Sequence, residues 1–164
     1  MGRKTSTYTR KRAHKPAPKN RLIAIAEREA SNAVRRASDA AFQSQITTVK
    51  IKMLMAEDGE DATELLSILA VVIGTPAQAG CMAGMHDQPW VRQLHGAMRS
   101  VQDMCLHGYQ WQTRYALALT RACEIAGEDQ PCFSVDVFYR AWLDANSMSE
   151  LISAHRVDQF TVVA

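Results

Sequence analysis

Two cysteines and three histidines gather in the middle of the chain, at Cys81, His86, His95, Cys105 and His107. Thiolate and imidazole groups are the ligands of tetrahedral zinc sites. His95 and Cys105 stand ten residues apart, which is about 15 Å along a helix and too far for one tetrahedral ion. The spacing favours buried thiols and half-exposed imidazoles, and we predict neither a metal site nor a cofactor.

A thiol beside an imidazole can also act as a nucleophile, and Cys81 with His86 is one such pair in the sequence. The spacing of this pair neither excludes nor selects it. The glycines at 74, 80 and 84 lack both the Lys-Ser/Thr ending and the preceding strand of a phosphate-binding loop. We therefore expect a protein that is not an enzyme.

Carboxylates along the chain have structural roles by helix phasing. Asp103 and Glu124 are expected to face solvent beside Arg99 and Arg121, where ion pairing accounts for them. The acidic segment Glu57–Glu64 lacks the ligand spacing of a calcium loop. Its acids are expected to complement the dipole at the start of a helix.

The cysteines at 81, 105, 123 and 132 include no C-x-x-C pair, and their spacing matches no zinc ribbon or finger. The basic start is not followed by the apolar core of a secretory signal, so we expect reduced thiols in a cytoplasmic protein. The longest apolar run, Leu65–Ile73, has nine residues. That is about half a membrane span, and we predict that no membrane is a partner.

The elements that must position these residues have helical periodicity, with apolar residues at three- or four-residue intervals from Leu22 onward. The stretch Val49–Met55 alternates apolar residues with lysine like a strand, but we favour a helix because a strand would lack an evident partner. The predicted helices run from Leu22 to the break at Gly59, from Asp61 to Ile73 before Gly74, from Pro89 to Gly108 after an Asp87 N-cap, from Trp111 to Gly127, from an N-cap at Ser134, and from a Ser147–Glu150 capping box, with a loop over Thr75–Gln88.

Large apolar side chains are expected to fill the core. The aromatic residues on predicted core stripes are Trp90, Trp111, Tyr115, Phe138 and Trp142. Met82 and Met85 differ, because their small-residue surroundings, GCMAGM, offer little reason for burial. We predict that these two methionines contact a partner protein.

The fold class that we predict is all-α: a single helical bundle of about five to six helices with a disordered basic N-terminal arm. The arm covers residues 1–21 and the helical domain covers residues 22–164. A composition of 47% hydrophobic and 22% charged residues supports a real core. Short connections favour antiparallel neighbours in the bundle.

Charge separates the two parts. The arm holds eight basic residues and no acidic one, whereas residues 22–164 hold eleven basic and seventeen acidic residues, so the arm carries +8 and the body −6. Each Lys or Arg that neutralises a phosphate releases counterions, which gives sequence-independent affinity for DNA or RNA backbone. The residues predicted to make these contacts are Arg3, Lys4, Arg10, Lys11, Arg12, Lys15, Lys19 and Arg21.

Other roles for the arm remain open. It could be a solvated tail that aids solubility, or it could bind another acidic partner. Its start, Met1-Gly2 followed by Ser6, matches the pattern for N-myristoylation. The acidic segment Glu57–Glu64 could also hold the arm while no polyanion is bound.

The sequence thus predicts a non-enzymatic helical protein that binds nucleic-acid backbone through its arm and a protein partner through its body. The alternative is a protein-binding adaptor or inhibitor with no nucleic-acid role, whose arm would fold against an acidic partner. No predicted helix carries a basic recognition face with neighbouring Asn or Gln, so we expect no base-specific readout.

Overall fold

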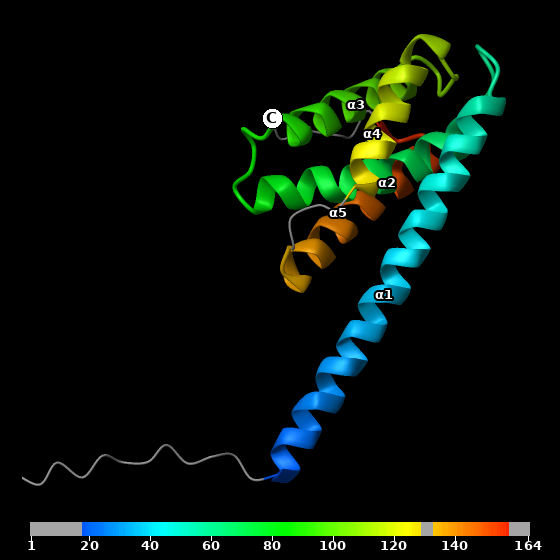
Figure 1. Cartoon of the computed structure of the whole chain (residues 1–164). Helices are drawn as coiled ribbons and strands as arrows, with labels where there is room; N and C mark the ends of the chain where they lie inside the picture. The colour runs from blue at the N-terminus through cyan, green and yellow to red at the C-terminus, as the bar shows by residue number, and fades with distance from the viewer. Residues whose placement is uncertain (1–17, 129–132, 158–164) are drawn as a thin grey trace, which may run out of the picture. The chain divides into compact units, whose positions relative to one another are not determined.

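The computed structural model describes residues 18–128 and 133–157, and within these ranges it is built from helices without a strand (Figure 1). The predicted all-α fold class is therefore confirmed. The helices are α1 Pro18–Met55, α2 Thr63–Met82, α3 Pro89–Leu106, the 3-10 helix η1 Thr113–Tyr115, α4 Ala116–Gly127 and α5 Val135–Ser153.

Two compact units divide the chain: unit 1 is Met1–Ser38 and unit 2 is Asp39–Ala164. Their boundary falls inside α1, and so does the boundary expected between residues 21 and 22. The helix begins at Pro18 rather than at Leu22. Proline suits the first turn of a helix, because its missing N–H would have no partner there. The other residues of the predicted arm, 1–17, lie outside the described part.

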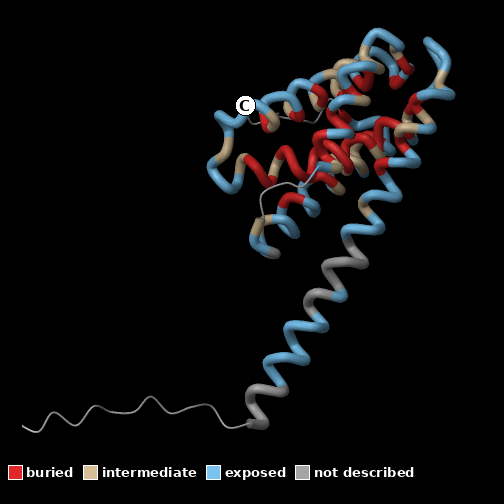
Figure 2. Tube along the Cα trace, viewed as in Figure 1, coloured by how far each residue is buried: buried red, intermediate tan, exposed pale blue. Residues whose placement is uncertain are grey.

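The core of unit 2 is organised around α2. Figure 2 shows buried residues concentrated along this helix, and α3, α4 and α5 pack against it. The second half of α1 adds Ile46, Val49 and Met53 to the same core. By length and composition α2 could cross a membrane, with a mean hydropathy of 1.7, but 67% of that window is buried within the structure. Its central position accounts for its apolar composition.

The predicted end of the second helix at Gly74 is wrong, because α2 continues through Gly74 and Pro76 to Met82. An interior proline typically costs about 3 kcal/mol through its missing N–H and its ring. Burial of the segment opposes that cost: Gly74, Thr75 and Pro76 are all buried. A Cβ on Gly74 would lie 3.5 Å from Cβ of Ala145, so this face of α2 packs closely on α5. The predicted loop shrinks to residues 83–88.

The preference for a helix over Val49–Met55 is confirmed. Val49 and Met53, one turn apart, are buried, whereas Ile51 between them is exposed. The two lysines reach acids on other helices: Lys50 Nζ lies 3.7 Å from Glu124 Oε1, and Lys52 Nζ pairs with Glu64 Oε1. The alternation that resembled a strand is thus one buried stripe flanked by ion pairs.

Helix α3 begins at Pro89 as expected, but its N-cap is Gln88 and not Asp87. Asp87 instead accepts a hydrogen bond from Arg92 Nη2 at 2.8 Å. The fourth α-helix begins at Ala116, so the prediction that it starts at Trp111 is wrong. Trp111 is buried in the connector before η1, where its backbone bonds to another turn rather than to a helix.

That other turn is the connection between α1 and α2. Gly59 N donates to Trp111 O, Trp111 N donates to Glu60 O, and Ala62 N donates to Tyr109 O, each at 2.8 Å. Asp61 and Gln110 form an antiparallel bridge at the centre of this pairing. The pairing ties two connectors that lie about 50 residues apart in sequence, and it sets the ends of α1 and α3 beside each other.

Helix α5 is continuous, so the prediction of a separate sixth helix is wrong. Ser134 caps α5 as expected, accepting a hydrogen bond from Val137 N at 3.3 Å. Ser147 does not begin a new helix, because its hydroxyl donates to the Leu143 carbonyl one turn earlier. Phe138 and Trp142 were expected in the core, but they are 36% and 42% exposed.

Candidate functional site

Most of the predicted phosphate contacts fall outside the described residues. Of the eight, Lys19 and Arg21 lie in the first turns of α1. The six that lie beyond the described ranges are Arg3, Lys4, Arg10, Lys11, Arg12 and Lys15. Binding by this set stays a prediction.

The division into two units sharpens the separation of charge. Unit 1 holds eleven basic and two acidic residues, a net charge of +9, whereas unit 2 holds eight basic and fifteen acidic residues, a net charge of −7. The difference in net charge between the two parts is thus slightly larger when the chain is divided between Ser38 and Asp39 than when it is divided at the end of the arm. All of the chain between Met1 and Ser38, arm and helix alike, belongs to the basic part.

Helix α1 continues the basic character of the arm at positions 21, 28 and 35, all of them arginine. Seven residues are nearly two helical turns, so the three positions follow one another along one face of α1, about 10.5 Å apart. Arg28 and Arg35 were not among the predicted contacts, although the seven-residue interval is visible in the sequence.

The acidic segment Glu57–Glu64 builds the turn between α1 and α2. Asp58 Oδ1 accepts a hydrogen bond from Thr113 N at 2.7 Å, which joins this turn to η1. Asp61 Oδ1 accepts from both the hydroxyl and the backbone N–H of Thr63, and these hydrogen bonds lower the pKa of Asp61. Asp58 and Asp61 therefore stabilise the turn between α1 and α2 through local hydrogen bonds.

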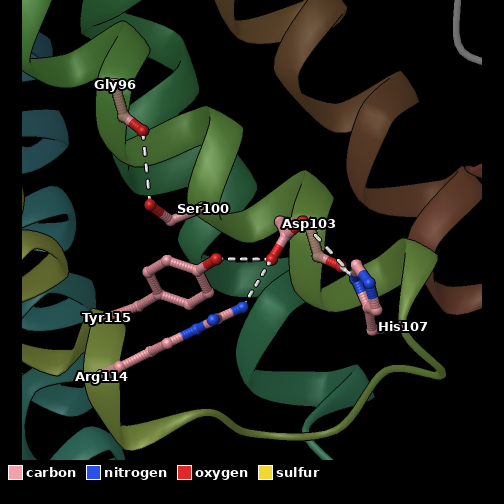
Figure 3. A network of polar contacts seen from close by, with 6 residues as sticks. All are labelled: Gly96, Ser100, Asp103, His107, Arg114 and Tyr115. Carbon is pink, nitrogen blue, oxygen red and sulfur yellow. Dashed lines mark hydrogen bonds and ion pairs between the residues drawn. The ribbon is translucent and has the colours of Figure 1, made fainter.

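A polar network joins the end of α3 to η1 (Figure 3). The Tyr115 hydroxyl donates to Asp103 Oδ2 at 2.5 Å, Arg114 Nη2 approaches the same oxygen at 3.2 Å, and His107 Nδ1 lies 3.4 Å from Oδ1. The hydrogen bond from Tyr115 is the main cause that lowers the pKa of Asp103, and it raises the pKa of Tyr115. The expected ion-pair partner, Arg99, is thus replaced by Arg114.

The expectation for Glu124 is confirmed, since Arg121 Nη1 lies 3.1 Å from its Oε2. This pair lines an open groove of about 450 Å³ between the second half of α1 and α4. The cations of the groove are matched by acids, because Lys50 also pairs with Glu124 and Arg121 also approaches Glu128. The groove therefore offers little net field to a charged ligand.

The central cysteines and histidines do not converge. No group of three or more His, Cys, Asp or Glu side chains is placed to hold a metal in residues 18–128 and 133–157. Cys105 and Cys123 are buried, and burial is the main cause that raises each pKa to about 12. One close contact does form: Cys81 Sγ lies 2.9 Å from His95 Nε2. The sequence had offered His86 as the neighbour of Cys81.

A second polar cluster lies where the C-terminal end of α5 meets the paired turns. His155 Nε2 lies 3.0 Å from the hydroxyl of Thr63, which donates to Asp61. The ring of His155 stacks on Tyr109, with 4.0 Å between the ring centres. Both stacked residues have a left-handed backbone, with φ of 54° and 60°. The stacking helps hold two unfavourable conformations in place.

Exposed apolar side chains mark the first half of α5. We call Phe138, Tyr139, Trp142 and Leu143 the α5 patch; each is between 36% and 56% exposed, and the rings of Tyr139 and Trp142 stack. Of the two methionines predicted to contact a partner, Met82 is exposed and Met85 is half-buried. Their role stays a prediction, whereas the α5 patch was missed because its aromatic residues continue a core stripe.

Comparison of the chain with protein-family models, with curated proteins and with solved structures finds no match.

Proposed function

We propose that this protein binds nucleic-acid backbone without sequence preference through its basic N-terminal part, performs no catalysis, and contacts a protein partner through unit 2. The observation that carries the proposal is the change of net charge from +9 to −7 at the boundary between the two units. A charge separation that coincides with a structural boundary favours a polyanion-binding segment attached to a folded body.

The physical basis of binding is counterion release. Each phosphate neutralised on duplex DNA contributes roughly −0.9 to the slope of log K against log salt. Eight contacts from the predicted arm residues would give a slope of about −7. The arginine positions 28 and 35 on α1 would add to this number, because they continue the face that begins at Arg21.

Fluorescence anisotropy of a labelled DNA duplex and of a labelled RNA, titrated between about 50 and 200 mM salt, tests the proposal. The wild-type chain is compared with a variant in which all eight Lys and Arg residues of the arm are replaced by Gln. We expect the wild type to show the steep slope and the variant to lose most of its affinity for both polymers. A slope near zero for the wild type would contradict the proposal.

A matched pair of double variants controls for net charge alone. Lys11→Gln with Arg12→Gln should flatten the slope by about two units. Arg99→Gln with Arg140→Gln removes the same charge from exposed positions of unit 2 and should leave the slope nearly unchanged. Equal effects of the two double variants would mean that binding follows the net charge of the whole chain and not its N-terminal part.

The second candidate function is a protein-binding adaptor without a nucleic-acid role, and the α5 patch favours it. Large aromatic side chains at a surface are typical of the centre of protein interfaces. Pulldowns with and without nuclease separate the two functions. Partners that persist after nuclease treatment, and are lost on Tyr139→Ala with Trp142→Ala but not on Leu117→Ala, would support the adaptor; Leu117 is an exposed control on α4.

A further inference from the structure

The contact between Cys81 and His95 joins two helices. Cys81 lies in the last turn of α2 and His95 lies in the second turn of α3. Sγ and Nε2 are 2.9 Å apart, so the thiol and the imidazole lie within hydrogen-bond reach of each other. Cys81 is half-buried, and the residues that follow it, Met82 to Gly84, are exposed. The thiol is therefore close to solvent, unlike those of Cys105 and Cys123.

The surroundings favour a neutral pair at rest. Burial raises the pKa of Cys81, so its thiol keeps the proton. Burial, and then the nearby Arg99, lower the pKa of His95, so its ring stays neutral to a lower pH than a free imidazole. The ring also hydrogen-bonds the backbone of Ala77. With the protonated thiol as donor, the nitrogen of the neutral ring that faces Cys81 is the acceptor of this contact.

We propose that Cys81 is a covalent modification site for soft electrophiles, with His95 as the base that accepts the thiol proton. The geometry has the features of an activated nucleophile: a thiol, a base within hydrogen-bond reach, and a third group that orients the base. The proposal stands independently of nucleic-acid binding.

With iodoacetamide as the probe, the reaction is a nucleophilic substitution at carbon. The Cys81 sulfur forms a bond to the carbon that bears iodine, the carbon–iodine bond breaks, and iodide leaves. The thiol proton passes to His95 Nε2 and from there to solvent. No oxidant or reductant takes part. Cys105 and Cys123 can react only as thiolates, and with pKa values of about 12 they are thiolates only at high pH.

The pH profile of the wild-type protein gives the most direct test. Peptide mapping by mass spectrometry after timed alkylation reports each cysteine separately. We expect Cys81 to react at least about tenfold faster than Cys105 and Cys123 near neutral pH. Its rate should level off once His95 is neutral, from a pH below 6.5, because the reactive form is a neutral thiol beside a neutral imidazole. A rate that rises steadily with pH up to the ordinary thiol range would overturn the proposal.

Substitution of the base provides the second test. His95→Gln should slow alkylation of Cys81 about tenfold near pH 7 and replace the plateau by a steady rise with pH. His107→Gln is the matched control, because His107 is exposed at the end of the same helix. If His95→Gln merely loosened the fold, Cys105 and Cys123 would react faster as well, and the pH profile of the wild type would then decide. An unchanged rate and profile at Cys81 in a folded His95→Gln variant would refute the role of His95.

Discussion

The side chains of unit 1 and unit 2 have different roles. Unit 2 buries an apolar core around α2, and several of its carboxylates hold turns or pair with lysine and arginine. Unit 1 holds eleven basic residues against two acidic ones, and Ile23 and Ile25 of its helical part are exposed. The apolar core and the excess of positive charge therefore lie in separate parts of one chain, and we expect that each can be altered without the other.

The largest expected effect on stability comes from the core of unit 2. Leu69, in the middle of α2, is fully buried, so Leu69→Ala should lower the free energy of unfolding by about 3 kcal/mol. Leu117→Ala, at a residue that is 83% exposed, should change it little. Urea denaturation followed by circular dichroism measures both.

The same substitution should leave binding to nucleic acid unchanged. While the Leu69→Ala variant remains folded, its slope of log K against log salt should equal that of the wild type. The variant in which the eight Lys and Arg residues of the arm are replaced by Gln should have the same urea midpoint of unfolding as the wild type. A loss of stability in that variant would show that the charges of unit 1 help to hold unit 2.

A smaller effect is expected at Gly80, where α2 packs closely against α3. A Cβ on Gly80 would lie 2.7 Å from Val91 Cγ2 and 3.0 Å from the Trp90 ring, so Gly80→Ala should cost about 1–3 kcal/mol. Gly96 on α3 provides the control, because a Cβ there meets nothing within 4 Å. Gly96→Ala should stabilise the helix by about 0.5–1 kcal/mol. Opposite signs in urea denaturation would confirm the close approach.

The smallest effect concerns the network around Asp103. Asp103→Asn removes the charge that Tyr115 and Arg114 contact, so it should lower stability slightly at pH 7. The pKa of Asp103 is lower in the folded state than its ordinary value of 3.8. Its contribution is therefore present above about pH 3.8 and is lost as the pH falls through the folded value. Thermal unfolding of wild type and variant should converge in that acidic range; a constant difference would contradict this.

Periodicity in the sequence was enough to predict the helical class, and two local signals placed the starts of α3 and α5. Pro89 and Ser134 mark the starts of α3 and α5. The fixed backbone angle of proline and the capping hydroxyl of serine both act locally, so they can be recognised in the sequence. Gly74 and Pro76 misled the prediction for the opposite reason. Their local preference for a break is overcome by burial against α3 and α5, which no pattern of single residues displays.

The same error concealed the contact between the Cys81 thiol and the His95 imidazole. With residues 75–88 taken as a loop, Cys81 has no defined neighbour. Once α2 continues to Met82, Cys81 lies in its last turn, opposite the second turn of α3 and His95. The α5 patch was missed because Phe138 and Trp142 keep the spacing of a core stripe, although both are partly exposed in the folded chain. Long-range packing decided both cases.

The pairing of the α1–α2 turn with the α3–η1 connector has a consequence for the proteolysis of the chain. Surface connectors are usually the first places that a protease opens, because a free loop adapts to the active-site cleft. Here the amides of Gly59, Ala62 and Trp111 are each bonded to the opposite connector, and these hydrogen bonds would have to break before either connector could enter a protease cleft. We therefore expect a protease to cleave these two connectors slowly, although both lie at the ends of helices.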